Sequence, residues 1–167
     1  KIRKILEAGI NVSIGTDSTA TGSENLLAEM KFARKVYRQM YGEDLPAKTL
    51  FDMVTGNPAK AFRMSDRIGA LEPGMNADIL ILKARKNEPY ENLAAASMED
   101  IEFLSVNGVP VLAEKRYQEL IPKDAEYEEV TVGGRAMLAK GKPSTLYKAI
   151  RSAVRIKKRL DYLPFQC

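Results

Sequence analysis

The chain has 167 residues, of which 45% are hydrophobic and 29% charged, a balance typical of globular domains. Its formal net charge of +4 is concentrated in residues 142–160, which hold seven Lys or Arg and no acidic residue, so we expect no nucleic-acid partner. No apolar run approaches the roughly 20 residues of a membrane span, and we expect no membrane contact. The single cysteine, Cys167, excludes an internal disulfide and fits a cytoplasmic location.

The first elements are a short helix and a strand. Residues 1–8 show the apolar periodicity of a helix, which Gly9 ends. Because no initiator Met precedes this pattern, we expect the chain to be either a piece of a longer protein or a processed product. The apolar run over residues 10–16 predicts a short buried strand, and a loop of small residues follows at 17–23.

Three helices are expected next. Thr21 to Glu24 has the spacing of a capping box and predicts a helix over about residues 24–41, which Gly42 ends. Pro46 suits the first turn of a second helix, and Asn57 begins a third, shorter one. The apolar face expected for the first of these helices comprises Leu26, Met30, Ala33, Tyr37 and Met40.

The second half of the chain is rich in strand signals. Residues 77–82 predict a strand, with Asp78 in a structural role at its head. Asn-Gly at 107–108 and Gly-Gly at 133–134 each lie between two β-rich runs and predict two hairpins. Residues 143–163 predict a basic helix with an apolar stripe. It either packs that stripe on the sheet, which we favour, or binds an anionic surface, RNA or a partner.

Asp17 is the candidate functional residue, because it stands where the expected strand ends and the loop begins. A carboxylate at the carboxyl end of a barrel strand points into the mouth where such active sites lie, and there it can bind a metal. An Asp in this position also commonly forms a turn through hydrogen bonds to the backbone. Position alone favours the turn-forming role.

Three segments that follow one another along the chain favour the metal-binding role of Asp17 over the turn-forming one. Residues 6–18, which contain Gly15-Thr16-Asp17-Ser18, resemble the eighth strand of the amidohydrolase superfamily, near its cytosine deaminase and chlorohydrolase branches. Residues 55–61 and 66–82 are similar to the segments that follow that strand. Beyond residue 83 the similarity is loose.

This resemblance implies an α/β fold: the C-terminal part of a metal-dependent hydrolase (β/α)8 barrel, with its last strand and helices, then a small, mostly antiparallel β domain and a C-terminal helix. We expect the barrel part at residues 1–65, the β domain at 66–141, and the basic helix and tail at 142–167. In an alternative division, residues 84–167 are an unrelated β module.

The resemblance also implies a site. Asp17 corresponds to the last ligand of a divalent metal, Zn²⁺ or Fe²⁺, and in the family it takes a proton from the metal-bound water and passes it to the leaving nitrogen. Ser18, Thr19 and Asn25 would lie beside a small-molecule substrate. The implied reaction is hydrolysis of a C–N or C–halogen bond, such as deamination of a nucleobase-like ring.

The chain departs from the family in having no histidine, although the family's metal site needs several. We therefore expect the isolated chain to bind no metal and to be inactive. The alternative is a non-catalytic assembly or binding module derived from an amidohydrolase. Since strand 10–16 lacks its barrel neighbours, we expect it either to dock on the local helices or to exchange between the copies of a homodimer.

Overall fold

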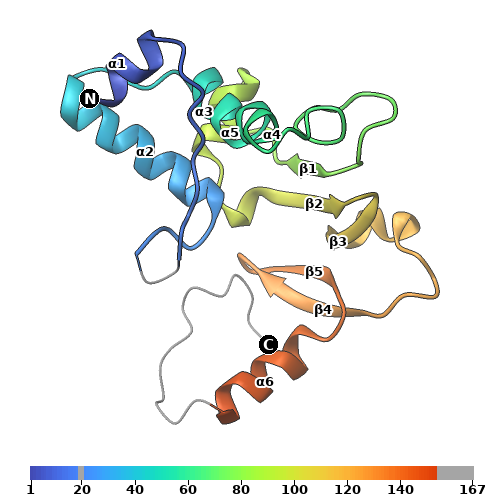
Figure 1. The fold of residues 1–167 in the computed structure, drawn as a ribbon. Helices are drawn as coiled ribbons and strands as arrows, with labels where there is room; N and C mark the ends of the chain where they lie inside the picture. Colours follow the sequence, from blue (N-terminus) through green and yellow to red (C-terminus); the bar gives the residue numbers. More distant parts are fainter. Residues whose placement is uncertain (19–20, 154–167) are drawn as a thin grey trace. The chain divides into compact units, whose positions relative to one another are not determined.

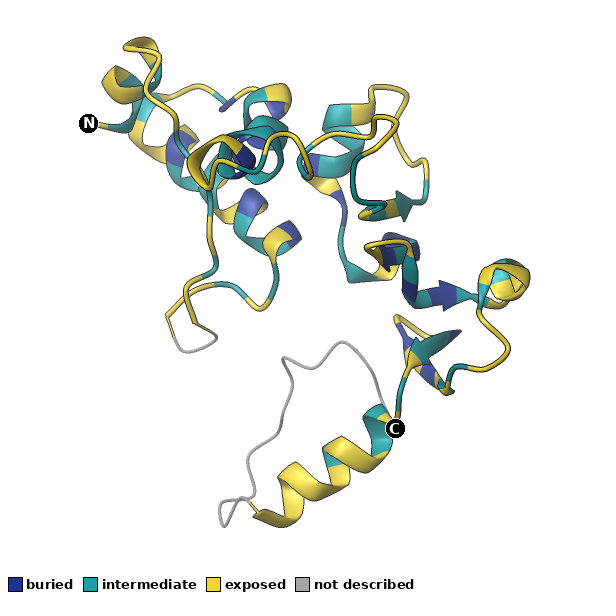
Figure 2. Cartoon of the chain, turned by 45° about the vertical axis from the view of Figure 1, so that its right-hand side comes forward, coloured by how far each residue is buried: buried dark blue, intermediate teal, exposed yellow. Residues whose placement is uncertain are grey.

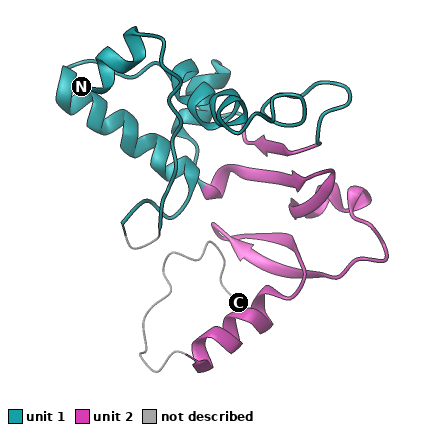
Figure 3. Cartoon of the chain, in the orientation of Figure 1, with its two compact units in different colours: residues 1–76, 84–97 teal, residues 77–83, 98–167 magenta. Residues whose placement is uncertain are grey.

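The computed structural model describes residues 1–18 and 21–153, and Figure 1 shows their helices and strands. The chain divides into two compact units, coloured separately in Figure 3. Unit 1 comprises Lys1–Asn76 and Ala84–Ser97, and unit 2 comprises Ala77–Lys83 and the chain from Met98 onward. None of the helices in the described part combines the length and the apolar character needed to cross a membrane. The domain bounds expected from the sequence stay a prediction.

Unit 1 is helical. Its elements are α1 (Ile2–Glu7), α2 (Leu26–Tyr41), α3 (Ala47–Val54), α4 (Gly56–Ala61) and α5 (Pro89–Ala95). The predicted capping box at Thr21 to Glu24 is wrong, because the N-cap of α2 is Asn25, four residues after Thr21. The Asn25 side-chain oxygen accepts a hydrogen bond from the backbone N–H of Ala28 at 2.9 Å and so satisfies a free donor of the first turn. Gly42 ends the helix at φ 74°, as expected.

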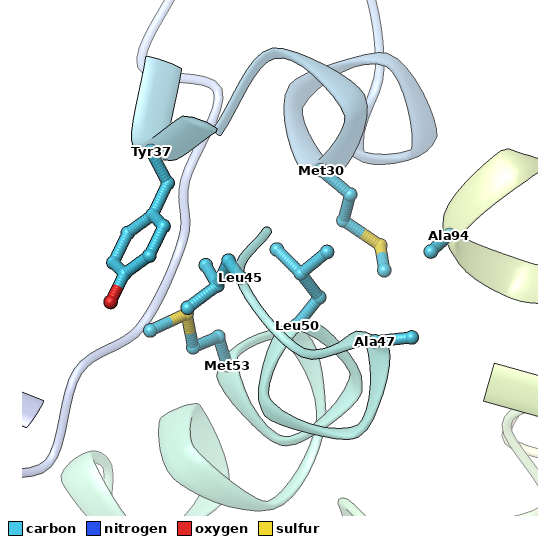
Figure 4. Packing of buried hydrophobic residues seen from close by; sticks show 7 residues of the cluster. All are labelled: Met30, Tyr37, Leu45, Ala47, Leu50, Met53 and Ala94. Atoms are coloured by element: carbon cyan, nitrogen blue, oxygen red, sulfur yellow. The ribbon is translucent and has the colours of Figure 1, made fainter. Parts of the chain in front are cut away.

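The core of unit 1 lies between α2, α3 and α5 (Figure 4). Its buried residues are Met30, Tyr37, Leu45, Ala47, Leu50, Met53 and Ala94. The predicted face of α2 is partly wrong, since Leu26 and Met40 are 38% and 58% exposed and Leu27 is buried instead. The buried stripe of α2 is therefore centred on Leu27, Met30 and Tyr37.

Residues 10–16 do not form the predicted strand; they run without regular secondary structure. The strands of the described residues all belong to unit 2, so this segment has no strand with which to form a ladder. It lies instead on the helices of its own unit, where Val12 and Ile14 pack against the core. Docking on the local helices, one of the two expectations for this segment, is observed. Exchange of the segment between the copies of a homodimer stays a prediction.

Unit 2 contains an antiparallel sheet, as predicted. Its strands are β1 (Ile79–Leu82), β2 (Ile101–Val106), β3 (Val109–Glu114), β4 (Tyr127–Val132) and β5 (Arg135–Lys140), in the order β1-β2-β3-β5-β4. The 3₁₀ helices η1 (Met98–Asp100) and η2 (Lys115–Leu120) precede β2 and follow β3. Val130, Val132 and Met137 form the buried cluster between β4 and β5.

Both predicted hairpins are confirmed. In the β2–β3 turn, Asn107 and Gly108 have φ values of 50° and 77°, and in the β4–β5 turn Gly133 and Gly134 have 54° and 75°. Two successive residues at positive φ make a type I′ turn, whose twist matches that of the strands.

The basic helix is confirmed as α6 (Pro143–Ala153), and residues 154–163 of the prediction lie outside the described part of the chain. Its first turn is tied to β4, because the backbone N–H of Ser144 donates to Glu128 Oε2 at 3.0 Å. Packing of the apolar stripe on the sheet is not observed: Leu146 is 62% exposed, and no residue of Pro143–Ala153 is buried (Figure 2). Within the described residues of α6, the first turn is anchored to β4 and the apolar side chains of Leu146 and Ile150 are exposed.

Candidate functional site

The segment that leads to Asp17 is held on α3 and α4 by three hydrogen bonds. The backbone N–H of Ile14 donates to the carbonyl of Met53 at 3.0 Å. The Asn57 side-chain amide donates to the carbonyl of Val12 at 2.8 Å, and the Asn11 amide donates to the carbonyl of Asn57 at 2.9 Å. These bonds replace the missing strand ladder and fix the path of the chain up to residue 14.

Asp17 itself lies at the end of this segment with its carboxylate exposed. Its φ of 57° is in the left-handed region, which residues with a side chain seldom adopt outside turns. The hydroxyl of Thr21 donates to Asp17 Oδ2 at 3.3 Å, and this hydroxyl is also 2.9 Å from the hydroxyl of Ser18. The carboxylate thus sits at the start of a turn.

A backbone turn closes the loop on the Ser18 side. The N–H groups of Thr21 and Gly22 both donate to the carbonyl of Ser18, at 3.1 and 2.7 Å. This turn brings Thr21 within reach of Asp17, four residues earlier, a contact that the sequence analysis missed. The signal for it was the hydroxyl residue at that spacing in a loop of small residues.

The other predicted site residues lie apart from this contact. Asn25 uses its side-chain oxygen to cap α2. Thr19 lies outside the described residues. The structure thus joins Asp17 and Ser18 through Thr21, and it gives Asn25 a bond of its own that a substrate role would have to share.

The residues of this chain do not by themselves make a metal site. Among residues 1–18 and 21–153, no three His, Cys, Asp or Glu side chains are grouped closely enough to hold an ion. The whole chain lacks histidine, the usual neutral ligand of Zn²⁺ and Fe²⁺. One exposed carboxylate is too few ligands for a site of useful affinity.

Asp78 has the structural role that the sequence indicated. Its carboxylate accepts a hydrogen bond from the backbone N–H of Asn107 at 2.6 Å. The backbone N–H of Gly108 donates to the carbonyl of Ala77 at 3.0 Å, beside this bond. Together they join the approach to β1 with the β2–β3 turn, so Asp78 is occupied within the sheet.

Comparison with known proteins shows that one protein family accounts for the first two thirds of the chain. A model of the amidohydrolase family matches residues 1–113. The match therefore continues past residue 83, where the similarity recognised from the sequence became loose, and includes β1, β2 and most of β3. This argues against an unrelated module that begins at residue 84.

Individual relatives are deaminases and hydrolases by name, and one of the similar solved structures contains zinc. The 5-methylthioadenosine/S-adenosylhomocysteine deaminase of Moorella thermoacetica is 32% identical over 142 residues, covering 78% of this chain and 32% of that enzyme. An S-triazine hydrolase of Gordonia rubripertincta is 29% identical over 153 residues, covering 83% of this chain and 32% of that enzyme. The crystal structure of the Arthrobacter aurescens atrazine chlorohydrolase with zinc superimposes with a TM-score of 0.58 at 28% identity, covering 75% of this chain and 29% of the solved one.

The chain spans about a third of the length of the curated relatives that it matches, 32% of the Moorella enzyme. The α/β class predicted from the sequence agrees with these neighbours, and the zinc-bound chlorohydrolase covers 75% of this chain.

Proposed function

The chain belongs to the amidohydrolase family, and from this premise we propose that it serves as the C-terminal part of a metal-dependent hydrolase that cleaves C–N bonds. The observation that carries the proposal is Asp17. It is an exposed carboxylate in the left-handed region, at the end of a docked segment that resembles the family's last barrel strand. The named relatives include deaminases and triazine hydrolases, so we propose a small-molecule substrate with a nitrogen-bearing, nucleobase-like ring.

In this proposal, Asp17 contributes one carboxylate ligand to a divalent metal site whose other ligands lie outside the chain. Such a metal, when bound, activates water for hydrolysis. The hydrogen bond from Thr21 orients the carboxylate, and the turn at Ser18 holds Thr21 in place. Ser18, Thr19 and Asn25 are proposed to lie beside the substrate, although Asn25 would have to keep its cap of α2 at the same time.

The isolated 167-residue chain is proposed to be inactive and metal-free. The absence of histidine from the whole sequence supports this. It equally supports the second candidate, a non-catalytic assembly or binding module derived from an amidohydrolase. The two differ in one respect: the hydrolase needs a His-x-His pair encoded upstream of residue 1, and the module does not.

The first test is the metal content of the purified chain, measured by elemental analysis beside the Asp17→Ala variant. We expect no stoichiometric Zn or Fe in either. Stoichiometric metal that is lost with Asp17 would overturn the proposal that the chain depends on outside ligands.

The second test is activity. In the longer protein, ammonia release from 5-methylthioadenosine and related adenosine derivatives is measured for the wild type, Asp17→Asn and Asp78→Asn. We expect Asp17→Asn to lower kcat by at least about 100-fold. This is the lower end of the range typical for the loss of a group that transfers a proton in the reaction. Asp78→Asn is the matched control, because its carboxylate is engaged by the Asn107 backbone N–H and its loss should leave kcat within a few-fold. Equal losses in both variants would contradict the role of Asp17.

A further inference from the structure

A depression of about 420 Å³ in the surface of unit 1 is lined mainly by cationic side chains. The Lys and Arg residues that line it are Lys31, Arg34, Lys35, Arg38 and Lys86. The first four recur at three- and four-residue spacing and so share one face of α2. Lys86 comes from the segment just before α5. The fold thus gathers charges from two parts of unit 1 that lie far apart in sequence.

The acidic side chains of the depression are already engaged. Glu91 accepts two hydrogen bonds from the guanidinium of Arg34, both at 2.7 Å. Asp44 accepts a hydrogen bond from Arg38 Nε at 2.5 Å, and Arg34 lies 3.4 Å from it. The lining therefore contains two carboxylates and five cationic side chains, and its net charge is positive.

The uncompensated charge of the lining belongs to the lysines. Lys31 and Lys35 are exposed residues one helical turn apart. The ammonium of Lys86 lies 3.9 Å from Glu91 Oε2, a carboxylate that Arg34 already holds. Flexible lysines carrying point charges are common ligands of phosphate groups. The Arg34–Glu91 bonds hold α2 and α5 together beneath them, so the concave shape does not depend on the lysines.

We propose that this depression binds a small molecule bearing an oligophosphate group. An excess of three positive charges matches a di- or triphosphate better than a singly or doubly charged anion. The volume lies within the range of about 300–1,000 Å³ seen for small-ligand pockets. The lining contains no aromatic side chain on which a nucleic-acid base could stack, which argues against a single-stranded nucleic acid. The inference does not rest on the proposed hydrolase function, because binding is measured without turnover.

The test is calorimetric titration of the 167-residue chain with inorganic triphosphate, with sulfate as the comparison anion. We expect one triphosphate per chain, weak binding of sulfate, and an affinity for triphosphate that falls as salt is raised. The double variant Lys31→Gln/Lys35→Gln should bind about tenfold more weakly, because two exposed charge contacts are lost. The matched control, Lys148→Gln/Arg151→Gln, removes the same charge from α6 and should bind within twofold of the wild type.

A second readout locates the site. Triphosphate should shift the backbone amide resonances of α2 near Lys31 and Lys35, and that of Lys86. Equal weakening in the two double variants, equal binding of sulfate and triphosphate, or shifts confined to α6 would each overturn the proposal. All four substituted side chains are exposed, so thermal unfolding of the variants should match that of the wild type and confirm that a loss is not due to misfolding.

Discussion

Arg34 and Glu91, 57 residues apart in sequence, form two parallel hydrogen bonds of 2.7 Å that join α2 to α5. Their side chains are only 22% and 33% exposed, so water screens the pair less than it screens most surface ion pairs. Beneath them Met30 of α2 and Ala94 of α5 belong to the same buried cluster. The ion pair therefore reinforces an apolar contact between the same two helices.

This pair should make the stability of the chain depend on pH. The hydrogen bonds and the charge of Arg34 hold the pKa of Glu91 below its usual value of 4.5. A carboxylate with a lowered pKa in the folded state stabilises the fold above the usual value, and this stabilisation is lost as the pH falls through the folded-state pKa. We expect Glu91→Gln to lower the unfolding free energy by about 1 kcal/mol at pH 7.

Thermal unfolding from pH 7 downward checks this expectation. The difference between the wild type and Glu91→Gln should shrink as the pH falls below 4.5, until the two curves meet. Glu72→Gln, at an exposed position, is the control and should follow the wild type throughout. A difference that persists unchanged into acid would show that Glu91 acts through packing and not through its charge.

Local signals in the sequence were sufficient at the hairpin turns and at the end of α2, although not at the start of α2, where Asn25 and not Thr21 is the N-cap. Asn107 and Gly108 identified a hairpin turn because few other pairs tolerate two successive positive φ values. Gly42 identified a helix end for the same reason. The similarity of the segment around Asp17 to a known family was also legible, because it rests on short motifs in a fixed order.

Features that depend on distant partners could not be predicted. Residues 10–16 have the composition of a strand, but a strand forms only when it pairs with another strand. This segment instead forms hydrogen bonds with residues of α3 and α4. The depression on unit 1 was missed because Lys86 joins the basic face of α2 only in the folded chain, where α5 packs on α2.

The cap at Asn25 leads to a second prediction. Asn25→Ala should lower the unfolding free energy by about 1 kcal/mol, because the Ala28 N–H loses its acceptor. Asn25→Ser should retain most of that stability, because serine is also a favourable N-cap. Urea unfolding monitored by circular dichroism measures both. Equal losses for Ala and Ser would mean that the amide contributes something other than the cap.

The β4–β5 turn provides a matched pair of glycines. Both have positive φ, so an alanine at either position costs about 1 kcal/mol in backbone strain. A Cβ at Gly133 would also come within 2.5 Å of Glu99 Cγ and 3.2 Å of Glu99 Cα, whereas a Cβ at Gly134 meets nothing within 4 Å. We expect Gly133→Ala to be the more destabilising by about 1 kcal/mol or more, measured by urea unfolding. If the two variants were equally stable, η1 would have to move away from the turn at little cost.

The last prediction concerns the segment that presents Asp17. Asn57→Ala removes the side-chain donor that holds the carbonyl of Val12 at 2.8 Å, while alanine itself favours the helix α4. We therefore expect little change in global stability but faster local opening of residues 10–16. Hydrogen exchange at the Ile14 N–H, which is bonded to the carbonyl of Met53 at 3.0 Å, should accelerate about fivefold, the effect of losing one hydrogen bond of about 1 kcal/mol.

Lys60→Ala is the matched control, since it changes an exposed residue of the same helix and should leave this exchange rate unaltered. An Ile14 exchange rate that is the same in all three proteins would mean that the apolar contacts of Val12 and Ile14 alone hold the segment in place.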